Sequence, residues 1–157
     1  MSHISWNEYF MEVALLTSKR SKDPSTKVGA CIVDLENRIV STGYNGFPKL
    51  LPKYNNDLVL PWNKESNNVL ETKYPYVIHA ESNAILNAYR SVRNCTIYVT
   101  LFPCAECSKL IIQSGISTVV YLNTTDTDRY KDSFTASKTM FELSGVRCFQ
   151  YDPEKII

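Results

Sequence analysis

Two short stretches of the sequence, His79-Ala80-Glu81 and Pro103-Cys104-Ala105-Glu106-Cys107, together offer an imidazole, two thiols and nearby carboxylates. Proline suits the first turn of a helix, so Pro103 predicts that Cys104 and Cys107 lie three residues apart on one face of that turn. The unpaired N–H groups and the dipole at this end of a helix favour the thiolate form, which a metal ion requires. The spacing of the two cysteines therefore favours a metal site at a helix N-terminus.

The stretch around His79 also opens a segment with helical periodicity. The apolar residues of this segment are Ala80, Ala84, Ile85, Ala88 and Tyr89. Two helix N-termini that face each other would supply His79, Cys104 and Cys107 to one zinc ion, and three protein ligands leave the fourth tetrahedral position for water, as in catalytic sites. Glu81 lies two residues after His79, close enough to exchange protons with that water, and such a pair is equipped for hydrolytic attack.

Each part of this pattern has a simpler explanation when it is taken alone. A Cys-x-x-Cys pair is often a redox pair or half of a structural zinc site, and a single histidine is often a core residue. A redox pair has no need of His79 and Glu81, however, and a structural zinc site would need a fourth ligand that is not obvious here. The combination therefore favours a catalytic zinc site.

The pattern H-x-E followed by P-C-x-x-C is the signature of zinc-dependent nucleobase deaminases. Beyond this signature, the chain resembles the deoxycytidylate (dCMP) deaminases, a branch of the cytidine deaminase superfamily, in blocks that run in the family's order. The blocks are residues 6–11, 20–24, 28–33, 43–46, 60–62, 73–77, 79–85 and 101–104. The signature alone indicates only the superfamily, whereas the other blocks select the dCMP deaminase branch.

The resemblance implies a hydrolase that converts dCMP to dUMP and ammonia and so supplies dUMP for thymidylate synthesis. It makes His79, Cys104 and Cys107 the metal ligands and Glu81 the catalytic acid and base, which acts on the attacking water, on N3 and on the departing amine. The backbone at Ala80 is expected to hold the pyrimidine ring. Residues 47–77 contain no Cys or His, so one catalytic Zn²⁺ ion per chain is expected.

Further residues are expected to contact the sugar and the phosphate of the substrate. Asn45 matches an asparagine that binds the sugar in this family. Tyr130-Lys131 resembles a Tyr-Arg pair that touches sugar and phosphate, although lysine keeps only a point charge where arginine offers two parallel bonds. Lys27, Thr26 and Ser25 are additional candidates for the 5′-phosphate. A solvated loop remains an alternative interpretation of Tyr130-Lys131.

Regulation is expected from the resemblance alone. It implies a homohexamer that is activated by dCTP with Mg²⁺ and inhibited by dTTP, at an allosteric site distinct from the zinc. The loop Gly43-Tyr44-Asn45-Gly46 is tied to this nucleotide regulation in the family. Glycine and asparagine also suit a tight turn, and the two interpretations are compatible.

Three other functions stay open at this point. A deaminase of cytidine, deoxycytidine or dCTP would share all of the zinc chemistry. A deaminase of polymeric nucleic acid is disfavoured, because the net charge is only +1 and no basic stripe is visible. A non-catalytic interaction domain stabilised by zinc would need a closed, four-ligand metal site.

Length and cysteine usage predict one domain, residues 1–157, that needs no disulfides. Five cysteines, two of them assigned to metal, suggest a reducing compartment, so a cytoplasmic enzyme is expected. Cys31, Cys95 and Cys148 lie in apolar runs that are typical of buried thiols. No stretch is apolar enough to cross a bilayer, and residues 1–6 have neither the basic flank nor the apolar core of a signal peptide.

Hydrophobic periodicity predicts helices that alternate with strands. Helices are expected at residues 6–20, after Ser5 and Glu8 as a capping box, then from 79, from 103 to Gly115, and at 133–144 with Gly145 as a stop. Strands are expected at residues 28–34, 38–42, 96–100, 118–122 and 146–151, the first two as a hairpin. This order indicates an α/β fold with a sheet covered on both faces. The resemblance implies the three-layer α/β/α sandwich with a five-stranded mixed sheet of the cytidine deaminases, here with an irregular insertion at residues 47–77 whose aromatic residues argue against full disorder.

Overall fold

A five-stranded sheet forms the centre of the computed structural model, which describes residues 2–154. The strands are β1 (Gly29–Val33), β2 (Ile39–Tyr44), β3 (Thr96–Leu101), β4 (Thr118–Asn123) and β5 (Arg147–Gln150), in the order β2-β1-β3-β4-β5. β1 runs antiparallel to both β2 and β3, whereas β3, β4 and β5 run parallel to one another. The predicted hairpin and the mixed sheet are therefore confirmed.

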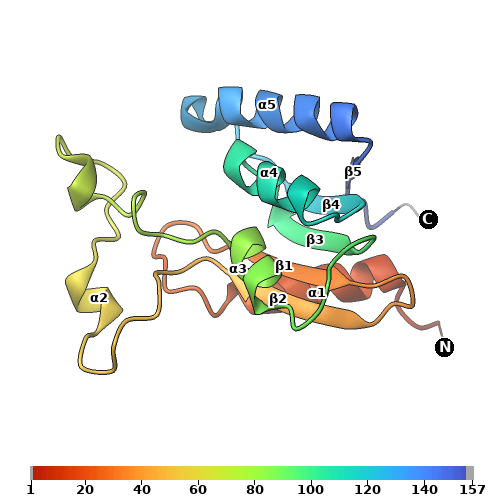
Figure 1. Cartoon of the computed structure of the whole chain (residues 1–157), viewed down its shortest axis with the longest axis horizontal. Coiled ribbons are helices and arrows are strands. Elements are labelled where there is room, and N and C mark those ends of the chain that lie inside the picture. Colours follow the sequence, from red (N-terminus) through yellow and green to blue (C-terminus); the bar gives the residue numbers. More distant parts are fainter. Residues whose placement is uncertain (1, 155–157) are drawn as a thin grey trace.

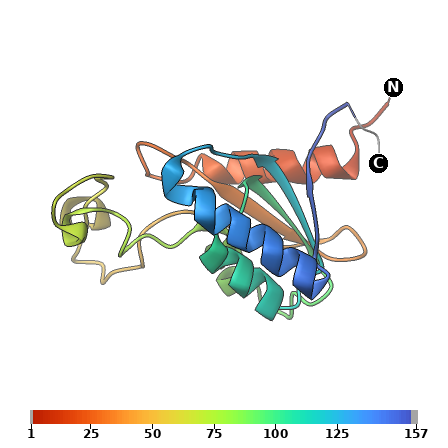
Figure 2. The same cartoon turned by 90° about the horizontal axis from the view of Figure 1, so that it is seen from above.

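Helices cover both faces of this sheet, so the predicted three layers are present (Figures 1 and 2). α1 (Trp6–Ser18) packs on one face through Phe10, Met11 and Ala14. α3 (Ala80–Asn87), α4 (Ala105–Gln113) and α5 (Asp128–Ser144) lie on the other face, over a core that includes Ile97, Val99 and Val119. The apolar residues of β1 and β3 alternate between the two core clusters, which is why β1 is buried along its whole length and β3 everywhere except at its two terminal residues.

Several helix ends lie where the sequence predicts them. The hydroxyl of Ser5 accepts a hydrogen bond from the backbone N–H of Glu8 at 3.1 Å and caps α1. Gly115 follows α4 with φ of 85°, and Gly145 ends α5 with φ of 74°. Both conformations are left-handed and favour glycine, which explains why these helices stop there.

Three local predictions are wrong. Pro103 lies before the cap of α4 rather than in its first turn, because Cys104 is the extended N-cap residue. α5 begins at Asp128 instead of 133, after the N-cap Thr127, which places Tyr130 and Lys131 on a helix rather than in a loop. α3 ends at Asn87 because Ala88 turns to an extended conformation, and Tyr89 is fully exposed rather than part of the apolar face.

The insertion at residues 47–77 forms an arm that extends away from the sheet on the left of Figure 1. It contains only the short helix α2 (Asn56–Val59) and the 3-10 turn η1 (Val69–Glu71). Phe47 packs on Trp62 with ring centroids 4.0 Å apart, and a bridge between Gly46 and Ile78 closes the base of the arm. Within residues 2–154, no helix combines the length and the apolar character needed to cross a membrane.

Candidate metal centre and active site

The three predicted metal ligands meet at the N-termini of α3 and α4. His79 is the N-cap of α3 and Cys104 is the N-cap of α4, and neither side chain caps its own helix. The Nδ1 atom of His79 lies 3.4 Å from the Sγ atoms of both Cys104 and Cys107. No other His, Cys, Asp or Glu joins this cluster among the side chains that the structure describes, which are those of residues 2–154 except 56 and 57. The ligand atoms of the cluster all lie within 4.8 Å of one another.

These separations fit a zinc ion. Tetrahedral zinc with its usual Zn–N and Zn–S bond lengths places nitrogen and sulfur ligands about 3.6 Å apart. The chemistry of the donors agrees, because imidazole and thiolate are the preferred protein ligands of zinc. Hydrogen bonding by Cys107 lowers the pKa of the Cys104 thiol, and His79 acts in the same direction despite the opposing effect of burial. Cys104 is therefore favoured as a thiolate, the form in which cysteine binds metal, whereas the hydrogen bond to Cys104 and burial raise the pKa of Cys107, which must lose its proton when a metal ion binds.

Glu81 lies in the first turn of α3 and is only 4% exposed. Burial raises the pKa of its carboxyl above the ordinary value of 4.5, and the charge of His79 only partly opposes this effect. A carboxyl whose pKa is raised holds its proton more readily, which suits a group that must both take up and release a proton. The sequence-based assignment of a proton carrier at Glu81 therefore agrees with its surroundings.

A pocket of about 180 Å³ opens beside the metal cluster. Its lining brings together five predicted site residues: Thr26, Asn45, Ala80, Glu81 and Tyr130. The ligands His79 and Cys104 line the same pocket, so the base-binding and metal-binding predictions converge on one site.

The remaining predicted residues lie elsewhere. Lys27 and Lys131 are exposed and do not line the pocket, and the same holds for Ser25. Gly43 and Tyr44 belong to the end of β2 and are also outside the pocket lining, as is Gly46. The structure thus does not bring the predicted phosphate contacts Lys27 and Lys131 to the substrate pocket.

Asn45 uses its side chain to hold one wall of the pocket. Its Oδ1 accepts a hydrogen bond from the N–H of Val28 at 2.9 Å, and its Nδ2 donates to the carbonyl of Thr26 at 2.9 Å. The same Nδ2 lies 3.4 Å from Oδ2 of Asp23. Asn45 therefore fixes the segment between α1 and β1, and a contact with the sugar stays a prediction that would use the second lone pair of Oδ1.

Two serines of α5, neither of them expected from the sequence, support the metal-binding helix. The hydroxyl of Ser133 accepts a hydrogen bond from the N–H of Ala105 at 2.7 Å, which satisfies one of the N–H donors that have no partner within the first turn of α4. The hydroxyl of the buried Ser137 lies 2.9 Å from the carbonyl of Pro103 and 3.1 Å from that of Ser133. Their spacing of four residues on one helix face is the only signal that could have indicated them.

Comparisons with known proteins agree with this geometry. A model of the cytidine and deoxycytidylate deaminase zinc-binding region matches residues 4–123. The deoxycytidylate deaminase of Mus musculus is 50% identical over 155 residues, which cover 97% of this chain and 83% of the mouse protein. The Homo sapiens deoxycytidylate deaminase is 49% identical over the same shares.

A solved structure also matches the fold. The dCMP deaminase from the cyanophage S-TIM5, in complex with dCMP and dUMP, aligns with a TM-score of 0.70 and 27% identity, over 95% of this chain and 100% of the phage chain. The predicted cytidine deaminase-like sandwich is thereby confirmed. The match of the zinc-binding region and of two relatives over nearly the whole length shows that the chain belongs to the family of cytidine and deoxycytidylate deaminases.

Proposed function

We propose that the chain catalyses the hydrolytic deamination of dCMP to dUMP and ammonia. The observation that carries this proposal is the buried carboxyl of Glu81 beside a three-ligand metal cluster, in a pocket that the predicted substrate residues line. The mouse and human relatives are deoxycytidylate deaminases, and the phage enzyme was solved with dCMP and dUMP. These relatives favour dCMP over the other small cytosine compounds.

The roles of the residues follow from their positions. His79, Cys104 and Cys107 would hold Zn²⁺, which supplies a Lewis acid that lowers the pKa of water to about 7. Glu81 accepts a proton from the attacking water and delivers it to N3 of cytosine. It then takes the remaining proton from the hydroxyl group added at C4 and delivers it to the amine, so that the C4–N bond breaks, ammonia leaves and C4 becomes a carbonyl. Ala80 presents its backbone to the pyrimidine ring, and Tyr130 and Asn45 face the sugar. This arrangement excludes bulk water from Glu81, which keeps its proton transfers directed at the base.

Regulation and assembly belong to the same proposal. We infer a homohexamer that is activated by dCTP with Mg²⁺ and inhibited by dTTP, with residues 43–46 in the allosteric region. In support, this loop contacts the helix that carries Glu81, because Nδ2 of Asn83 in α3 donates to the carbonyl of Tyr44 at 2.8 Å. A conformational change at residues 43–46 would therefore act directly on the position of α3 through this hydrogen bond.

Release of ammonia from dCMP by the purified, zinc-loaded protein tests this function. We expect turnover of dCMP that rises when dCTP and Mg²⁺ are added and falls when dTTP is added. If neither dCTP nor dTTP changes the turnover of dCMP, the proposed reaction stands and the proposed regulation is refuted. Preference for cytidine, deoxycytidine or dCTP would refute dCMP as the substrate, and activity only on single-stranded DNA or RNA would indicate a nucleic-acid deaminase.

The metal content gives a second test. We expect about one zinc ion per chain in the parent protein and a large loss of both zinc and activity in Cys107→Ser, because two protein ligands hold a catalytic zinc poorly. Cys148→Ser is the matched control, since this half-buried thiol lies outside the cluster. Metal analysis of both variants checks the prediction, and full zinc occupancy in Cys107→Ser would contradict it.

A further inference from the structure

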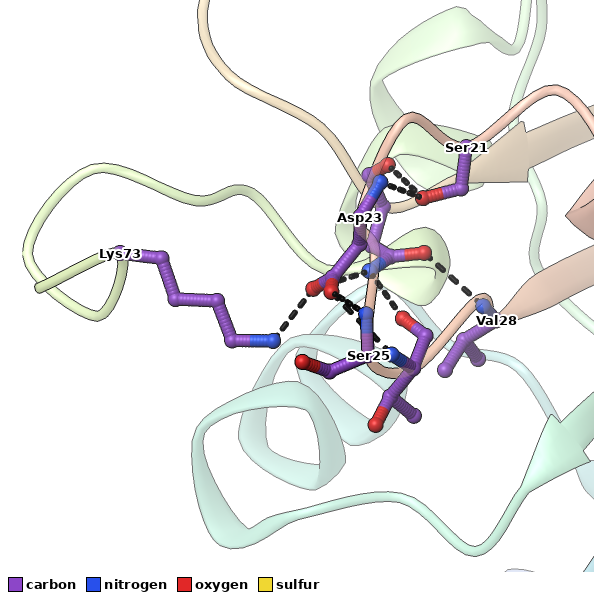
Figure 3. Close-up of polar contacts among 7 residues, drawn as sticks. Ser21, Asp23, Ser25, Val28 and Lys73 are labelled. Carbon is purple, nitrogen blue, oxygen red and sulfur yellow. Dashed lines mark hydrogen bonds and ion pairs between the residues drawn. The ribbon is translucent and has the colours of Figure 1, made fainter. Parts of the chain in front are cut away.

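Lys73 is a buried cation at the end of the arm formed by residues 47–77. Its side chain is only 8% exposed, and it makes an ion pair with Asp23, whose side chain is fully buried. Figure 3 shows the lysine extending from the insertion to the aspartate, which lies in the segment between α1 and β1. The two residues are fifty positions apart, so this pair joins the arm to the wall of the pocket.

The negative charge of Asp23 is already satisfied by the protein. Its Oδ1 accepts hydrogen bonds from the N–H groups of Ser25 at 2.8 Å and Thr26 at 3.1 Å. Burial acts to raise the pKa of Asp23, but the hydrogen bonds from Lys73, Ser25 and Thr26 outweigh it and hold the pKa below the ordinary value of 3.8. Asp23 is therefore a carboxylate at neutral pH that stays bound within its own loop.

Lys73 has donors left for a ligand. An ammonium group carries three N–H donors, and Asp23 is the only hydrogen-bond partner of this ammonium group among the described side chains of residues 2–55 and 58–154. Lys73 lines the same pocket as Glu81 and Asn45. The cations predicted from the sequence, Lys27 and Lys131, are exposed and outside this pocket.

Other donors surround the same part of the pocket. Lys64 of the arm also lines it, as do the hydroxyl-bearing residues Thr26 and Thr127. Thr127 is the N-cap of α5, and its side chain makes no capping bond. Ammonium groups, hydroxyls and a helix N-terminus are the groups with which proteins bind phosphate.

We propose that Lys73 binds the 5′-phosphate of the nucleotide substrate and that Asp23 is a positioning residue that holds the ammonium group in the pocket. The inference rests on the proposed function and names the residue that selects a nucleotide over a nucleoside. Because Asp23 fixes the long lysine side chain before the substrate arrives, less conformational entropy is lost on binding. The arm thereby contributes a specificity residue to a site that is otherwise built on the sandwich.

Kinetics of Lys73→Met test this role. The side chain of methionine keeps most of the length of lysine but has no charge, so we expect the KM for dCMP to rise about 10- to 100-fold while kcat changes far less. The kcat/KM for deoxycytidine, which has no phosphate, should stay close to that of the parent. Lys49→Met, the same change at an exposed position of the same arm, should leave both substrates unaffected.

The double variant Asp23→Asn/Lys73→Met separates phosphate binding from a structural role. Lys73→Met leaves a buried carboxylate without its partner, which by itself can disturb the fold, whereas the double variant removes both charges. If Lys73 binds phosphate, the double variant regains thermal stability but keeps its high KM for dCMP. Recovery of a normal KM for dCMP, or an equal loss on dCMP and deoxycytidine in Lys73→Met, would overturn the proposal. An inactive parent protein would instead refute the proposed function.

Discussion

Glu81→Gln should lower the kcat for dCMP by about 10³- to 10⁴-fold, because a side chain that cannot carry a proton removes general acid–base catalysis from every proton transfer. The amide has nearly the same shape as the carboxyl, and Glu81 is not among the metal-binding cluster, so zinc should remain bound. Loss of a buried carboxyl with a raised pKa should also leave the fold intact or slightly more stable. Ammonia release and metal analysis on the same sample measure the two effects.

The control for this variant is Glu106→Gln. Glu106 lies in the first turn of α4, as Glu81 lies in that of α3, but its side chain is 82% exposed. Its replacement removes the same charge close to the metal cluster and should change kcat little. Near-normal turnover by Glu81→Gln, or an equal loss in Glu106→Gln, would show that Glu81 does not carry the protons.

Gly43→Ala should strongly reduce the stability of the protein. A Cβ atom at Gly43 would lie 2.3 Å from the backbone N of Ala84 and 2.4 Å from the carbonyl O of Ala80, far inside any tolerated contact. Both atoms belong to α3, so the helix must move as a body away from β2. We expect a loss of about 3 kcal/mol in the free energy of unfolding, seen as a fall of about 6–12 °C in the melting temperature. Because α3 carries His79 and Glu81, dCMP turnover should fall as well.

Gly46→Ala provides the matched comparison. The nearest atom to a Cβ at Gly46 is Cε2 of Tyr44 at 4.0 Å, an ordinary contact. Its melting temperature should therefore stay close to that of the parent. A stable Gly43→Ala protein that has lost only its response to dCTP would contradict the packing argument and favour a regulatory role for Gly43.

The metal centre could be predicted from the sequence because its determinants are local. Cys104 and Cys107 are three residues apart, and His79 and Glu81 are two apart, so one turn of helix fixes each pair. The C-terminal ends of α4 and α5 could also be predicted from the sequence, because Gly115 and Gly145 adopt left-handed conformations that other residues avoid.

The phosphate end of the pocket could not be predicted in this way. Lys73 and Asp23 meet across fifty residues, and the segment before Lys73 has no period that would orient its side chains. The sequence instead indicates Lys27 and Lys131. These lysines directly follow the pocket residues Thr26 and Tyr130 in the chain, but both are exposed to solvent. The start of α5 could not be predicted for a related reason. Its first turn has one half-buried aromatic residue, Tyr130, among the exposed polar residues Asp128, Arg129 and Lys131, which is too little to show an apolar period.

The bridge between Gly46 and Ile78 makes the arm a permissive place for changes in chain length. Because Gly46 and Ile78 pair directly, the two points at which the arm joins the sandwich stay in place when the chain between them changes in length. A doubling of loop length costs only about 0.6 kcal/mol in closure entropy. We therefore expect that residues 48–61 can be shortened, extended or replaced by another peptide at little cost to the sandwich. Such changes keep Trp62, which packs on Phe47, and Asn63, whose carbonyl accepts a hydrogen bond from the N–H of Lys73.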